Sequence, residues 1–179
     1  MSIINEEEIR KETLVEIAKK MMIAARTAPK AKGIDNLVIT IAEGETISKI
    51  AAKMKEMVEN GTRPEFYLRD AGNILVSDVI LLIGTRISPA GIKQCGLCGF
   101  RDCEEKGNYP ETPCSFNTGD LGIAIGSAVS AASDSRVDNR VMMSVGMAAK
   151  EMKLLGEDVK IVYGIPLSCS GKSPFFDRK

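Results

Sequence analysis

Four cysteines lie close together in the middle of the chain, at positions whose spacing suits a metal centre. Cys95, Cys98 and Cys103 belong to the run CGLCGFRDC, and Cys114 follows, which gives the pattern C-x2-C-x4-C-x10-C. Four thiolates from one loop can surround one compact centre of soft metal ions. The glycines that follow the first two cysteines allow tight turns and direct amide N–H groups toward cluster sulfurs. The spacing therefore predicts a [4Fe–4S] cluster held by these four thiolates.

Two other interpretations of the same cysteines remain open. The first is structural zinc, which usually needs two short C-x2-C knuckles across a gap, whereas this chain has one. Zinc would make the chain a non-catalytic binding or scaffold protein. The second is a set of reduced loop cysteines without metal. Against it stands the conformational entropy lost on ordering a long glycine-rich loop, which a bound metal would offset. The fifth cysteine, Cys169, lies near the C-terminus, and its role is left open.

Composition excludes several classes of function. The chain has 24 basic and 24 acidic residues, so no net charge attracts it to nucleic acid or to an anionic membrane. It has no histidine, which excludes Ser-His and Cys-His catalysis and imidazole metal ligands. Proton delivery would then fall to a carboxylate, a lysine, a tyrosine or bound water. We expect a cytoplasmic protein, because its start is acidic where a signal peptide would be basic and then apolar, and because no stretch is long enough to span a bilayer.

The elements that would position these cysteines alternate between helices and strands. Apolar spacing predicts helices over residues 6–26, 46–59, 65–76, 121–133 and 139–155. Runs rich in β-branched residues predict strands over 36–42, 79–84 and 159–164. Asp138 is expected to be the N-cap of the last helix. The pattern predicts a single domain over residues 1–179, of the α+β class with α/β-like alternation, in which helices cover a central sheet and residues 85–120 form a cysteine-rich insertion.

Glycines recur near the start of the helix predicted over residues 121–133. Gly119, Gly122 and Gly126 could cradle a phosphate at the helix N-terminus, but their spacing is not the dinucleotide fingerprint. No strand precedes them, since the cysteine-rich insertion does. We therefore expect these glycines to allow close backbone packing.

Several segments resemble known families. The run CGLCGFRDC is similar to the C-x2-C-G-x3-C start of cluster-binding segments in ferredoxin-like modules, including those of corrinoid iron–sulfur proteins. Over nearly its whole length the chain resembles a family of ferredoxin-domain-containing proteins from anaerobic bacteria and archaea. That likeness rests on ARTAPKAKG, the cysteine run, GDLGIAIGSAV, DNR and the tail GIPLSCSGKSPFFDR. The resemblance implies cluster binding and leaves the reaction open.

A second resemblance is to nitroreductase-like flavoproteins, although their paired arginines are missing here. Arg26-Thr27-Ala28-Pro29 followed by Asn36 resembles the turn that leads into their first strand, and the Gly-x-Pro turn before a basic tail resembles their C-terminal end. The likeness implies a nitroreductase-like fold, a homodimer with the helix over residues 141–155 at its interface, and bound FMN. The flavin contacts that it implies are Arg26, Asn36, Lys172 and Arg178, whose cations would suit a phosphate.

Together these observations predict an iron–sulfur electron-transfer protein, and a candidate FMN- and iron–sulfur-dependent oxidoreductase of unknown substrate. Its redox partner would be a donor or acceptor protein or a small molecule, and neither a nucleic acid nor a membrane. The alternative is the zinc-stabilised binding or scaffold protein.

Overall fold

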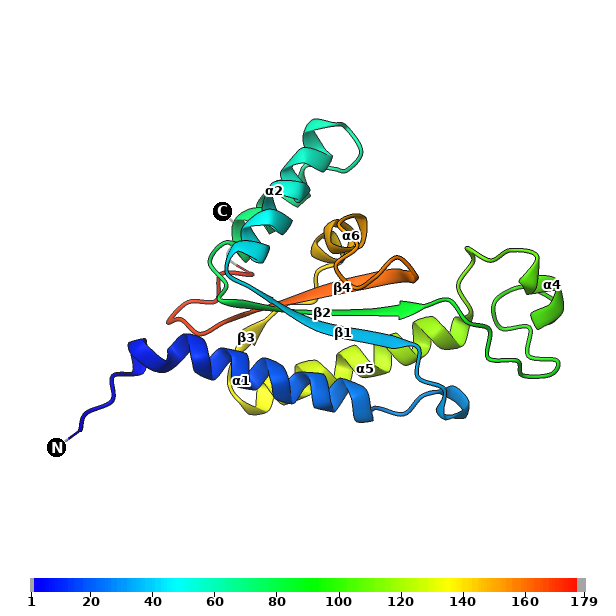
Figure 1. Ribbon diagram of the computed structural model, residues 1–179, viewed down its shortest axis with the longest axis horizontal. Helices are drawn as coiled ribbons and strands as arrows, with labels where there is room; N and C mark the ends of the chain where they lie inside the picture. Colours follow the sequence, from blue (N-terminus) through cyan, green and yellow to red (C-terminus); the bar gives the residue numbers. More distant parts are fainter. Residues whose placement is uncertain (1, 177–179) are drawn as a thin grey trace.

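An antiparallel sheet of four strands runs through the centre of the molecule, seen here in a computed structural model that describes residues 2–176 (Figure 1). The strands lie in the order β1-β2-β4-β3, so β2 and β4 occupy the middle. Their bounds are β1 (Leu37–Glu43), β2 (Val79–Arg86), β3 (Asp138–Asn139) and β4 (Val159–Ser168). All of β2 except its last residue is buried, as the uninterrupted apolar run predicts for a central strand.

Helices cover both faces of this sheet, and their side chains form two hydrophobic clusters. α1 and α5 pack on one face, and α2, α3 and α6 pack on the other (Figure 1). The side chains of β2 alternate between the clusters, because Leu81 and Ile83 face α1 and α5 whereas Ile80 and Leu82 face the other layer. The helices are α1 (Glu6–Thr27), η1 (Ala31–Gly33), α2 (Glu45–Glu59), α3 (Phe66–Ile74), α4 (Cys103–Gly107), α5 (Ser115–Asp134) and α6 (Met143–Glu151). The predicted class, a sheet covered by helices, is confirmed.

The region before α6 differs from the sequence-based prediction. Residues 139–155 were expected to form one helix capped by Asp138, but Asp138 and Asn139 form β3, and α6 begins at Met143. Asp138 pairs with Ser168 and Asn139 with Leu167, so β4 extends beyond the predicted residue 164. These backbone partners are distant in sequence, and local helical spacing does not reveal them. The prediction of Asp138 as an N-cap is therefore wrong.

α6 lies unusually close to β4 because glycines stand at the points of contact. A Cβ atom on Gly146 would lie 1.8 Å from the carbonyl oxygen of Val162. On the strand, a Cβ atom on Gly164 would lie 2.2 Å from Cγ1 of Val145. Neither position has room for a side chain, because Gly146 faces the backbone of β4 and Gly164 faces the Val145 side chain of α6.

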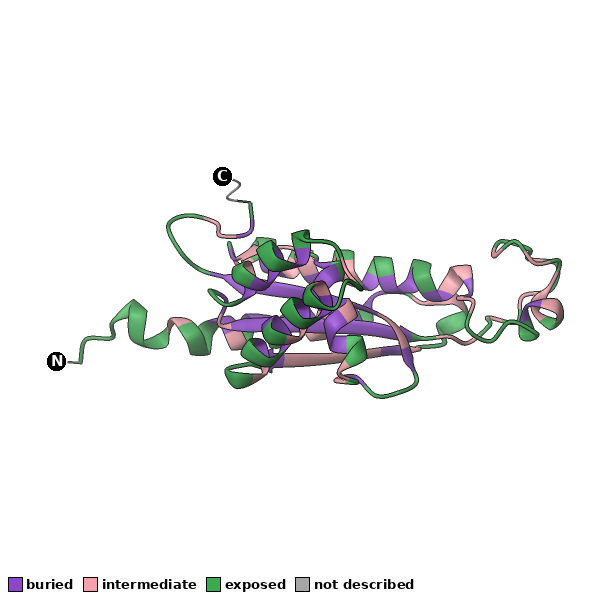
Figure 2. Cartoon of the chain, turned by 90° about the horizontal axis from the view of Figure 1, so that it is seen from above, coloured by how far each residue is buried: buried purple, intermediate pink, exposed green. Residues whose placement is uncertain are grey.

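The connection between β2 and α5, residues 87–114, projects beyond one end of the sheet (Figure 1). We call it the cysteine segment. It lies within the predicted insertion 85–120, whose first residues belong to β2 and whose last belong to α5. In this segment only Lys106 and Cys114 are buried, whereas most of the sheet is (Figure 2). Within residues 2–176, no helix combines the length and the apolar character needed to cross a membrane.

Candidate metal centre

The four predicted ligand cysteines line one cavity in the cysteine segment. Cys95, Cys98, Cys103 and Cys114 all contribute to its wall. The first three are half-buried, and Cys114 is buried. The remaining wall residues are mostly small or apolar: Ala90, Ile92, Gly96, Leu97, Asp102, Ser115 and Phe116. The structure thus brings together all four cysteines that the spacing singled out.

The turn that carries Cys95 and Cys98 depends on backbone conformations that favour glycine. Gly96 and Gly99 have φ angles of 62° and 87°, in the left-handed region. The Gly99 N–H donates to the Gly96 carbonyl at 3.0 Å and closes the turn around Cys98. The two glycines therefore let both thiols of the C-x2-C pair reach the same cavity.

Cys103 is positioned by α4, a short helix that the sequence analysis did not predict. Asp102 is its N-cap and accepts a hydrogen bond from the Glu105 N–H at 2.9 Å. The Glu105 carboxylate in turn accepts from the Arg101 N–H at 2.6 Å, which resembles a capping box. The Glu105 N–H and the Arg101 guanidinium together hold the pKa of Asp102 below its usual range. The sequence Asp102-x2-Glu105 was the signal that could have revealed this helix.

Cys114 lies at the N-cap of α5, the long helix that crosses the molecule. Its backbone is extended, and its carbonyl accepts hydrogen bonds from the N–H groups of Asn117 and Thr118. The N-terminal end of a helix carries partial positive charge, which favours negative charge on a nearby group. This position therefore suits a thiolate and fixes it to the helical layer of the molecule.

Two contacts hold the base of the cysteine segment. The Ser88 N–H donates to Oδ1 of Asn117 at 2.8 Å, which ties the start of the segment to the first turn of α5. The Lys32 ammonium donates to the Ala90 carbonyl at 3.1 Å. Farther out, the rings of Phe100 and Tyr109 stack with centroids 5.0 Å apart. The segment has little else to order it, since it contributes no side chain to either hydrophobic cluster.

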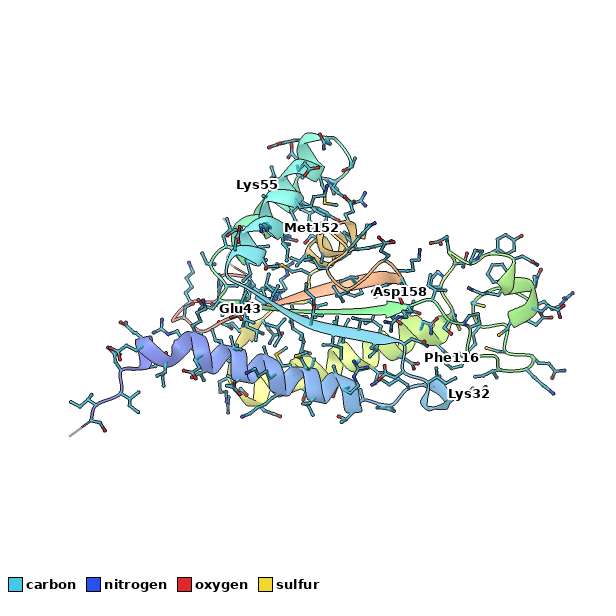
Figure 3. All side chains as sticks on the ribbon, in the orientation of Figure 1. Lys32, Glu43, Lys55, Phe116, Met152 and Asp158 are labelled. Atoms are coloured by element: carbon cyan, nitrogen blue, oxygen red, sulfur yellow. The ribbon has the colours of Figure 1, made fainter. Side chains whose placement is uncertain are left out.

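An open groove adjoins the cysteine cavity. Leu97, Ser115 and Phe116 line both spaces. Lys32 and Phe116 lie at the end of the molecule from which the cysteine segment projects (Figure 3). The other groove residues come from the turn after α1 and from α5: Pro29, Lys30, Ala31, Gly119, Asp120 and Ile123. Both carboxylate oxygens of Asp120 accept from the Ala31 N–H at 3.1 Å, which fixes the turn against α5.

The predicted flavin contacts Arg26 and Asn36 do not line this groove, although Lys30, which does, donates to the Arg26 carbonyl. Arg26 pairs with the Asp35 carboxylate at 2.6 Å and donates to the Leu37 carbonyl at 3.2 Å. Partial burial disfavours ionisation of Asp35, yet the hydrogen bonds from Arg26 and from the Leu37 N–H hold its pKa below the usual range. The Asn36 carbonyl accepts from the Arg86 N–H at 3.0 Å. Arg26 is thus already engaged by an internal carboxylate.

Lys172, the third predicted flavin contact, lies at the opposite end of the sheet. Leu37 pairs with Thr85 near the end of β2, whereas Leu167 pairs with Val79 at its start. The tail that carries Lys172 leaves from this second end. One protomer therefore does not bring Lys172 to Arg26 and Asn36. The fourth predicted contact, Arg178, lies outside the described residues.

Cys169 is also remote from the metal centre. It directly follows β4 and is exposed. It lines a separate cavity with residues of α1 and with Ser135, which caps the far end of α5. Within one protomer it is therefore separated from the cysteine segment by the length of the sheet.

Comparison with known proteins places the chain in a family. A profile of the family described as "Uncharacterized protein containing a ferredoxin domain" matches residues 111–178, which include Cys114 but not the other three ligand candidates. An uncharacterized protein of Archaeoglobus fulgidus is 42% identical over 183 residues, covering 98% of this chain and 97% of that protein.

Solved structures resemble the chain in fold. A nitroreductase with bound FMN from Desulfitobacterium hafniense superposes with a TM-score of 0.61 at 14% identity, over 88% of this chain and 78% of that one. A nitroreductase family protein from Clostridium novyi superposes with a TM-score of 0.59 at 14% identity, over 94% of this chain and 76% of that one. A BluB-like flavoprotein from Clostridium difficile superposes with a TM-score of 0.57 at 19% identity, over 92% of this chain and 82% of that one. The predicted nitroreductase-like fold is confirmed, and the chain belongs to the family of proteins that contain this ferredoxin domain.

Proposed function

We propose that the chain is a redox protein that binds a [4Fe–4S] cluster through Cys95, Cys98, Cys103 and Cys114 and passes electrons through it. The observation that carries the proposal is that all four thiols line one cavity. When bound, the cluster would accept and release single electrons. The chain's own part is to supply the thiolates, hold one of them at a helix N-terminus and surround the centre with backbone N–H groups. Membership of the ferredoxin-domain family supports this role.

The spacing of the cysteines favours a cluster over a single zinc ion, because zinc sites usually pair two C-x2-C knuckles and this chain has one. A zinc ion binds its thiolates at about 2.3 Å, which requires the sulfurs to approach within roughly 4 Å of one another. A cluster has an iron atom for each thiolate, so it holds the sulfurs farther apart around one cavity.

A flavin-linked reductase is the second candidate, and the groove beside the cysteine cavity favours it. A ring bound against Phe116 and Leu97 would lie next to the cluster, because both residues also line the cysteine cavity. The similarity in fold to an FMN-containing nitroreductase supports this candidate. Because Arg26 and Lys172 lie at opposite ends of the sheet, a flavin that contacts both would need two copies of the chain.

A homodimer is part of the proposal, and the open face of α5 supports it. Nothing lies within 4 Å of the position that a Cβ atom would take on Gly119, Gly122 or Gly126. Glycine in a helix costs about 1 kcal/mol relative to alanine, and the packing of one protomer does not require it at these positions. A second copy of the chain, packed closely against this face of α5, would fill the open space beside these glycines. Within one protomer α6 packs against β4 and contacts α2 and α3, and its place at the dimer interface stays a prediction.

The cluster is tested by purifying the protein without oxygen, recording its visible spectrum, and measuring iron, sulfide, zinc and flavin in the same sample. We expect near-equal iron and sulfide and a broad brown absorbance that bleaches on reduction. The variant Cys103→Ser should lose iron and sulfide, whereas Cys169→Ser, the matched control, should load like the wild type. Zinc alone, or no metal after anaerobic reconstitution, would refute the cluster. A flavin signal that accompanies the cluster would support the reductase.

A further inference from the structure

Lys106 is a buried lysine inside the cysteine segment. It is 2% exposed, whereas the other charged side chains of the segment are half-buried or exposed. Among the described residues, no carboxylate lies within ion-pair distance of its ammonium group and no acceptor forms a hydrogen bond with that group, which keeps only slight contact with solvent. Removing an ammonium group from water without a partner is unfavourable. Nothing in the local sequence predicts that this lysine is buried.

The carboxylates nearest to Lys106 in the chain are engaged elsewhere. Asp102 accepts hydrogen bonds from the Arg101 guanidinium at 2.8 Å and from the Glu105 N–H at 2.9 Å. The Glu105 carboxylate accepts from the Arg101 N–H at 2.6 Å. Glu104 is exposed. The described protein therefore leaves the Lys106 charge without a neutralising group, and a bound anion would supply one.

A loaded metal centre would be such an anion. Lys106 follows Cys103 by three positions on α4, and residues with this spacing share one face of a helix. Cys103 lines the cysteine cavity from that helix. Four thiolates carry more negative charge than a [4Fe–4S] core carries positive charge, so the loaded centre is an anion. Interactions between charges are strongest where water is excluded.

We propose that Lys106 is the charge partner of the cluster, and that its ammonium group stabilises the bound centre and favours electron uptake by it. Reduction adds negative charge to the centre, so a nearby cation stabilises the reduced form more than the oxidised form. The inference rests on the proposed function, because it needs a cluster held by the four cysteines. It adds a residue that is not a ligand but tunes the centre.

The test compares Lys106→Met and Lys106→Gln with Lys106→Arg, which keeps the charge, and with Lys93→Met, which removes an exposed lysine of the same segment. Each full-length protein is loaded anaerobically, and two quantities are measured: the reduction potential and the rate of iron loss to a chelator. Far-ultraviolet circular dichroism verifies that each variant is folded. We expect the two neutral variants at Lys106 to lower the equilibrium constant for electron uptake at least tenfold, a shift of about 59 mV for one electron. They should also lose iron faster, whereas Lys106→Arg and Lys93→Met should behave like the wild type.

Equal potentials and equal iron loss in all loaded proteins would overturn the role of Lys106 and leave the cluster in place. Equal shifts in Lys106→Met and Lys93→Met would also overturn it, since a general charge effect would then explain them. A wild-type chain that takes up no cluster would refute the proposed function, and with it this inference.

Discussion

Asn117 on the first turn of α5 accepts a hydrogen bond from the backbone N–H of Ser88, just after β2, at 2.8 Å. Asn117 is 2% exposed, so water does not readily replace this contact. The bond joins the two ends of the cysteine segment where they leave the body. The amide side chain of Asn117 therefore helps to fix Cys114 relative to the start of the segment.

Asn117→Ala should loosen the base of the segment. The partly buried Ser88 N–H would lose its acceptor, which costs about 1 kcal/mol of stability. We expect a lower urea midpoint and faster loss of iron to a chelator from the loaded protein. Asn108→Ala removes an exposed amide of the same segment and serves as the control. Equal chelation rates in the two variants would show that Asn117 does not hold the site.

Gly146→Ala should destabilise the fold strongly. The new methyl group would lie 1.8 Å from the Val162 carbonyl oxygen, so α6 would have to move away from β4. Overpacking of this kind typically costs about 1–3 kcal/mol, and we expect the upper end because the opposing atom belongs to the backbone. Urea unfolding followed by circular dichroism measures the loss. Wild-type stability in this variant would mean that α6 and β4 are farther apart than the structure places them.

Gly122→Leu should separate the proposed dimer without unfolding the protomer. The position is open in a single chain, but a leucine there would prevent close approach of a second α5. We expect the sedimentation coefficient to fall to the monomer value while the circular dichroism spectrum is unchanged. Gly72→Leu is the matched control, because Gly72 is also an exposed helical glycine with open space around it, but it lies on α3. A dimer that persists in Gly122→Leu would exclude this face as the interface.

The ion pair between Asp35 and Arg26 should make a small, pH-dependent contribution to stability. The pKa of Asp35 is lowered in the folded chain, so its contribution is fully present above the unfolded pKa of about 3.9 and is lost as the pH falls through the folded value. Asp35→Asn should therefore lower the urea midpoint at pH 6 but have little effect at pH 2. We expect a difference of about 1 kcal/mol or less at pH 6, since both side chains are partly exposed.

Asp134→Asn, at an exposed aspartate at the end of α5, is the control for that experiment and should show no such difference. An effect of Asp35→Asn that is the same at pH 6 and pH 2 would mean that the charge of Asp35 does not contribute to stability.

Local patterns predicted most of the fold. The capped, amphipathic stretch that became α1 and the apolar run that became β2 each carry enough information within a few residues. β3 could not be found in this way, because two residues form a strand only when β4 is there to pair with them. α4 was not predicted although Asp102 and Glu105 gave a capping signal, because a helix of five residues is too short to show apolar periodicity.

The sequence likewise predicted only part of the candidate site. The grouping of the four cysteines could be predicted because one segment carries all of them, and their spacing limits how far apart they can lie. The flavin contacts came from three segments, and sequence order does not tell at which end of a sheet each segment lies. Lys172 proved to be at the other end from Arg26 because β4 runs antiparallel to β2. Lys106 was overlooked because burial of a lysine depends on packing that composition does not reveal.

The exposed thiol of Cys169 offers a site for selective chemical labelling. With four of the five cysteines occupied by metal, this exposed thiol would be the one available to an alkylating reagent. A spin label attached there would stand roughly 25 Å from the cysteine segment, the length of an eight-residue strand. Its relaxation by a paramagnetic centre could then report the oxidation state of that centre without touching it. The natural sequence thus already contains a single attachment point for spectroscopy.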